Sequence, residues 1–67
     1  MKEFEKLYKE VFDTEGNVLA CGREKCKELI KLANAINNNI NFGDENTGFI
    51  NIKNMSILYE EIKSDRI

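Results

Sequence analysis

The sequence predicts a mainly α fold with a small β element, in which one domain over residues 1–67 contains three helices and a short strand pair or hairpin around residues 40–50. Apolar residues recur at helical spacing in three stretches of the chain. Between the second and third stretches, a brief alternation of apolar and polar residues leads into a glycine-containing turn, which is typical of a hairpin. A chain of 67 residues buries only about 60% of the surface that its unfolded form exposes, so we expect one thin core.

The first helix is predicted over residues 2–12. One face carries its large apolar side chains, and lysine–glutamate pairs four residues apart lie on the other face. That apolar face comprises Phe4, Leu7, Tyr8, Val11 and Phe12. Residues 13–17 form a turn by residue type, because they include Gly16 and polar side chains that bond to local backbone. The apolar run at 18–20 is too short to separate a strand from one helical turn.

The central helix is predicted over residues 23–37. Because it lies between two shorter amphipathic segments, we expect the rest of the chain to pack around it. Its apolar face comprises Cys26, Leu29, Ile30, Ala33 and Ile36. Arg23, Lys27 and Lys31 follow one another four residues apart along the flank of that face, and we call them the basic stripe. Three asparagines at 37–39 end the helix, because asparagine tolerates the left-handed conformation.

The hairpin is predicted as a strand at residues 40–42, a turn at 43–48 and a second strand at residues 49–50. Asn51 then caps the third helix, which is predicted over residues 52–64. Its apolar face comprises Met55, Leu58, Tyr59 and Ile62. Combining the apolar faces predicts a core of Phe4, Leu7, Tyr8, Val11, Leu19, Cys26, Leu29, Ile30, Ala33, Ile36, Phe49, Met55, Leu58 and Ile62.

The charge and composition narrow the class of protein. The net charge is −2 and the isoelectric point about 5.1, which argues against a general binder of nucleic acid or of anionic membranes. No apolar run reaches ten residues, so we expect neither a membrane span nor a signal peptide, and the default is a cytoplasmic protein with reduced thiols. Nine asparagines beside many lysines and isoleucines suit an AT-rich bacterial or phage genome or a mobile element.

The two cysteines have a structural interpretation. With Gly22 as the cap of the central helix, Cys21 and Cys26 stand at the two positions of a hydrophobic staple. Cys21, close to Arg23 and Lys25, is the candidate for an accessible thiol. The chain has no histidine, which excludes Cys–His hydrolysis, and two cysteines alone do not build a zinc site.

Residues 44–51 resemble the calcium-binding loops of EF-hands and dockerin modules, with Gly48 in front of an apolar pair. The register does not support the resemblance. If Gly48 takes the sixth position of such a loop, the first position falls on Gly43 and the last on Asn54, and neither residue has a carboxylate. A polar turn between strands accounts for the same residues, so no calcium site is expected.

The order of helix, short element, basic helix, hairpin and helix resembles that of winged-helix DNA-binding domains. In that interpretation the basic stripe enters the major groove and residues 40–50 form the wing. Two features oppose it: Asp44 and Glu45 at the tip of the wing would face phosphates, and an acidic chain releases few counterions. Nucleic acid is therefore the alternative rather than the leading expectation.

The leading hypothesis is a small non-catalytic interaction or regulatory protein that self-associates. We expect a homodimer or a complex with another protein. A chain this small usually needs a source of stability besides its core. Because the sequence has no disulfide framework and no metal cluster, a second subunit is one way to supply that stability. Leu32 and Ile57 lie off the apolar stripes of their helices and are candidates for a partner surface. With no glycine-rich phosphate loop and no clustered carboxylates, the sequence offers no catalytic constellation and implies no cofactor.

Overall fold

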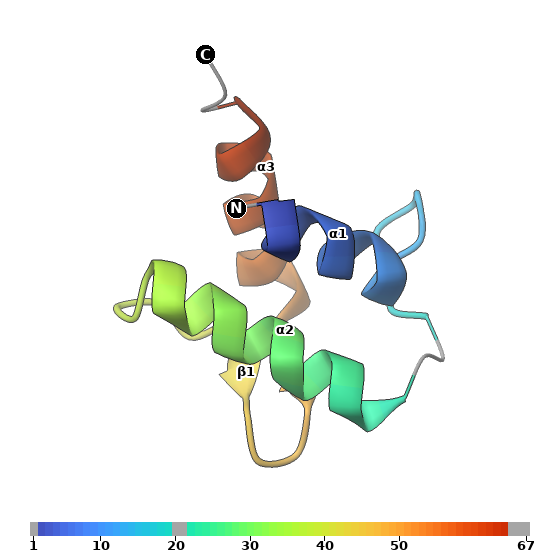
Figure 1. Ribbon diagram of the computed structural model, residues 1–67, viewed down its shortest axis with the longest axis vertical. Coiled ribbons are helices and arrows are strands. Elements are labelled where there is room, and N and C mark those ends of the chain that lie inside the picture. The colour runs from blue at the N-terminus through green and yellow to red at the C-terminus, as the bar shows by residue number, and fades with distance from the viewer. Residues whose placement is uncertain (1, 20–21, 65–67) are drawn as a thin grey trace.

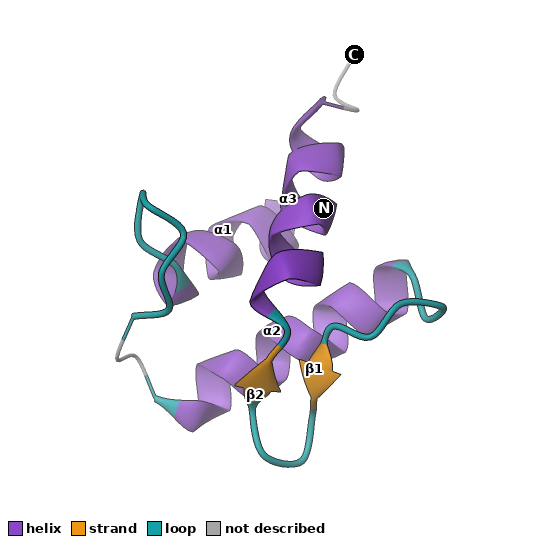
Figure 2. Cartoon of the chain, turned by 180° about the vertical axis from the view of Figure 1, so that it is seen from behind, coloured by secondary structure: helices purple, strands orange, loops and turns teal. Residues whose placement is uncertain are grey.

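The computed structural model describes residues 2–19 and 22–64. The elements in chain order are α1 (Lys2–Val11), α2 (Arg23–Ile36), β1 (Gly43–Asp44), β2 (Phe49–Ile50) and α3 (Ile52–Ser64). In Figure 1, α1 lies above α2 and in front of α3, and the hairpin projects below the middle of α2. The reverse view in Figure 2 shows α3 and the hairpin in front of α2. The predicted mainly α fold with a small β element is confirmed.

The end of α1 folds back on itself. Val11 is its last helical residue, one before the predicted end. Phe12 then forms an isolated antiparallel bridge with Val18, and the Leu19 N–H donates to the Val11 carbonyl at 2.7 Å. The Asp13 carboxylate closes the intervening turn by accepting backbone N–H groups at 2.9 and 2.8 Å. The short apolar run after the turn is thus a bridge partner at Val18 and not a helical turn; its last residue lies outside the described residues.

α2 begins after Gly22, whose φ of 98° no other residue adopts as readily, and the helix has no side-chain cap at that end. Cys26 is buried, as predicted, whereas the proposed staple partner Cys21 lies outside the described residues. The helix ends at Ile36, one residue earlier than predicted, where the Asn37 N–H donates to the Ala33 carbonyl at 2.9 Å.

The hairpin differs from its prediction in the position of the first strand. β1 lies at Gly43–Asp44 and pairs with β2 in the register Gly43↔Ile50 and Asp44↔Phe49. The predicted strand at 40–42 is wrong because the Asn41 side chain turns back onto the chain, where its Oδ1 accepts the Gly43 N–H at 3.0 Å. Gly48 ends the turn at a φ of +79°, and its N–H donates to the Asp44 carbonyl at 2.8 Å.

α3 starts as predicted. The Asn51 Oδ1 accepts the Asn54 N–H at 3.1 Å, which caps the helix. Ile50 and Met55, which flank this cap at staple spacing, are both buried. The helix therefore begins directly at the end of β2, and this junction fixes the hairpin relative to α3.

One core joins all three helices and the hairpin. Its buried residues are Phe4, Tyr8, Val11, Phe12, Cys26, Leu29, Ile30, Ala33, Phe42, Ile50, Met55, Leu58 and Ile62, with Leu7, Leu32, Ile36 and Tyr59 partly buried against it. Two core predictions are wrong: Leu19 is 41% exposed and Phe49 is 79% exposed. Because consecutive strand residues point to opposite faces, Ile50 takes the inward position and its neighbour Phe49 points outward.

Candidate interaction surfaces

The outer face of the hairpin presents one large apolar side chain to solvent. Phe49 is the most exposed of the large hydrophobic residues described, at 79%. Beside it lies a hollow of about 300 Å³. We call this surface the hairpin face, and it is lined by Asn41, Gly43, Asp44, Phe49 and Asn51. An exposed ring next to an open hollow is a geometry for contact with another molecule.

Two further exposed apolar residues belong to the same part of the chain. Ile40 is 40% exposed and Ile52 is 47% exposed, so segment 40–52 carries three of the six exposed large hydrophobic residues that the structure describes. The two ends of this segment are tied together. The Asn54 side-chain N–H donates to the Asn41 carbonyl at 2.8 Å, and the Asn51 N–H donates to the Phe42 carbonyl at 3.0 Å. The segment is thus a defined surface and not a loose loop.

The outer edge of β1 is poorly suited to adding another strand. The Gly43 N–H is already bonded to the Asn41 side chain, and each strand has only two residues. An edge donor occupied from within the chain and a very short strand are both devices that block edge-to-edge pairing. The hairpin face therefore presents side chains to solvent, not a strand edge that is free to pair.

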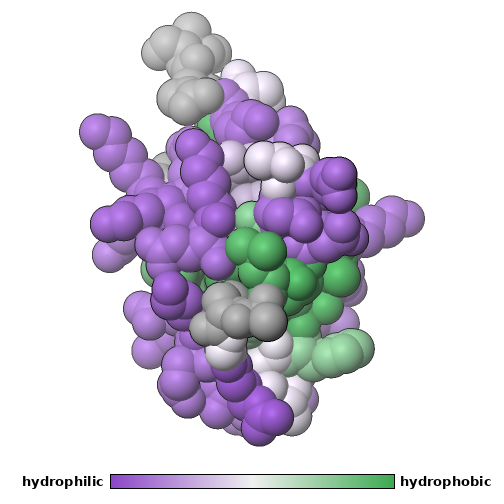
Figure 3. Space-filling view, turned by 90° about the vertical axis from the view of Figure 1, so that its right-hand side faces the viewer, coloured by the Kyte–Doolittle hydropathy of each residue, from purple (hydrophilic) through white to green (hydrophobic). Residues whose placement is uncertain are grey.

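A second hollow, the α1–α3 groove, lies between α3 and the end of α1. Its volume is about 770 Å³. It is lined by Tyr8, Lys9, Phe12, Asp13, Thr14, Glu15, Gly16, Leu19, Ser56, Tyr59, Glu60 and Lys63. Figure 3 views the side of the molecule where α1 ends, and apolar side chains gather in the middle of it among hydrophilic ones. Val18 and Leu19, at 39% and 41% exposure, belong to this end of the molecule.

The aromatic residues of the groove stack on one another. The centroid of the Tyr8 ring lies 3.8 Å from the Tyr59 ring centroid and 4.3 Å from the Phe12 ring centroid. The corresponding interplanar angles are 4° and 10°. The Lys63 ammonium lies 5.0 Å from the centre of the Tyr59 ring, a cation–π distance. These rings already have partners within the chain, so little of their surface remains for a ligand.

Two of the titratable groups that border this groove, Tyr8 and Asp13, have shifted pKa values. Burial raises the pKa of the Tyr8 hydroxyl, and the nearby Tyr59 and Glu60 act in the same direction. Tyr8 is therefore a neutral phenol at ordinary pH and not a base. Hydrogen bonds from the Asn17 and Glu15 backbone lower the pKa of Asp13, which keeps this carboxylate charged at the end of the groove.

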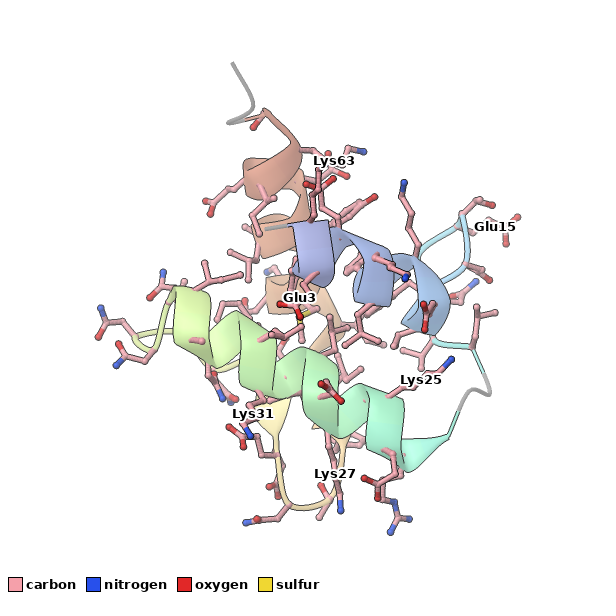
Figure 4. The ribbon with its side chains drawn as sticks, in the orientation of Figure 1. Glu3, Glu15, Lys25, Lys27, Lys31 and Lys63 are labelled. Atoms are coloured by element: carbon pink, nitrogen blue, oxygen red, sulfur yellow. The ribbon has the colours of Figure 1, made fainter. Side chains whose placement is uncertain are left out.

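The basic stripe lies along the hairpin side of α2. Figure 4 shows Lys27 and Lys31 directed to that side, whereas Lys25 points to the α1 side, where its Nζ lies 3.1 Å from a Glu10 oxygen. The hairpin turn packs on the stripe so closely that a Cβ at Gly48 would come within 2.8 Å of the Arg23 side chain.

Farther along α2, the Asn34 side chain donates to a Glu45 oxygen at 3.1 Å. The structure thus brings Arg23 and Lys27 together with an acidic turn. A recognition helix needs an open face to enter a DNA groove, and here the hairpin occupies part of that flank.

The two residues of the predicted partner surface differ in exposure. Leu32 is partly buried and packs against the core. Ile57 is 46% exposed and comes two residues after the buried Met55, which places it on the opposite side of α3 from Met55. Cys21, the predicted accessible thiol, lies outside the described residues.

Sequence reasoning missed the hairpin face because it assigned Phe49 to the core. A signal was present: two adjacent apolar residues on a strand point to opposite faces, so Phe49 and Ile50 do not both enter one core. The groove was missed because its stack joins Phe12, Tyr8 and Tyr59 across two helices, and such pairing is a tertiary fact.

Within residues 2–19 and 22–64, no three His, Cys, Asp or Glu side chains gather in a way that could hold a metal ion. In the same residues, none of the helices has the length and apolar character needed to cross a membrane. No family model matches the chain, and neither a curated protein nor a solved structure matches it. Function is therefore inferred from the surfaces of this chain alone.

Proposed function

We propose that this chain is a small non-catalytic interaction protein of the bacterial or phage cytoplasm, and that it self-associates as a homodimer. The observation that supports the proposal is the exposure of Phe49, Ile40 and Ile52 on segment 40–52, which hydrogen bonds hold in a defined conformation. Exposed apolar side chains leave water when a second protein covers them, which favours association. A thin core adds a reason, because small domains commonly gain stability from a second subunit.

The non-catalytic part of the proposal rests on the chemistry of the side chains. The sequence has no histidine, which is the residue most often used for proton transfer near neutral pH. The Tyr8 phenol, which lines the α1–α3 groove, has a raised pKa and stays protonated. The Asp13 carboxylate, which lines the same groove, has a lowered pKa and is engaged by backbone N–H groups, so it is a weak base.

Nucleic-acid binding through the basic stripe is the less supported alternative. Glu45 is held against α2 by Asn34, which puts negative charge on the helix that carries the basic stripe. The net charge of −2 leaves little electrostatic attraction to a duplex.

Sedimentation equilibrium over a range of protein concentrations tests the proposal. The expected result is a mass that rises from 7.8 kDa toward twice that value as the concentration increases. A mass that stays at 7.8 kDa up to about millimolar protein would contradict self-association, because even weak complexes form at that concentration.

A further inference from the structure

No further inference is drawn: the strongest candidate, the exposed Phe49 ring and the hollow beside it on the hairpin face, carries none, because nothing in the structure shows what covers that ring.

Discussion

The aromatic residues of this small domain form two regions with opposite environments. In the α1–α3 groove, Tyr8 stacks between the rings of Phe12 and Tyr59, and Phe12 is only 3% exposed. On the hairpin face, Phe49 is 79% exposed. The first region uses its aromatic surface to hold the chain together. The second leaves its ring in solvent, so the groove contributes to the stability of the fold whereas the Phe49 ring contributes little to it.

The two phenylalanines give the most direct test of this difference. Phe12→Ala should lower the free energy of unfolding by about 3–5 kcal/mol, because it empties a buried site beside Tyr8. Phe49→Ala should change it by no more than about 0.5 kcal/mol, since the ring contributes little to the core of one copy. Urea denaturation measures both.

The Phe12→Ala and Phe49→Ala variants must be compared at low protein concentration. A variant that still dimerises would otherwise gain apparent stability from the dimer. If Phe12→Ala does not fold, Phe12→Leu keeps most of the volume and should show a smaller loss in the same direction. A loss at Phe49 comparable to that at Phe12 would show that the Phe49 ring also stabilises the fold.

The second test concerns the backbone that holds Phe49 in place. Gly43→Ala should cost about 1–3 kcal/mol, because Gly43 has a φ of +135° and an added methyl group would collide with the Phe49 carbonyl oxygen. Gly16→Ala is the matched control: its φ is +88°, but a methyl group there meets nothing, so it reports the backbone strain alone. Thermal unfolding should rank Gly43→Ala as the more damaging change; the reverse order would mean that the two strands are not packed closely at Gly43.

The smallest expected effect concerns the groove at alkaline pH. Burial raises the pKa of Tyr8 above the ordinary value of 10.0, so the folded state prefers the neutral phenol more than the unfolded state does. The resulting stability is complete below pH 10 and is lost as the pH rises through the folded-state pKa. Tyr8→Phe keeps the stacked ring but lacks the hydroxyl, so its stability should fall less as the pH rises above 10. Equal slopes for the two proteins would show that Tyr8 ionises as freely in the fold as in the unfolded chain.

Local patterns in the sequence were enough to predict the three helices. The apolar spacing of each helix survives in the fold because the same residues face the core, and the Asn51 cap forms as predicted because it needs only neighbours three residues away. Helix ends at Val11 and Ile36 differ from the prediction by a single residue, since the last turn of a helix depends on the conformation of the residues after it.

Only the tertiary structure decided which apolar residues outside the helices are buried. Phe42 and Ile50 enter the core while Phe49 and Leu19 do not. For Phe49 and Ile50, the register of the two-residue strand pair makes that choice. The candidate surfaces are set by the same choice. The basic stripe could be predicted from the sequence. Its contact with the hairpin turn at Gly48 could not be predicted, because that contact joins residues more than twenty positions apart. Local periodicity determines helices, whereas the placement of a short strand depends on what the helices leave exposed.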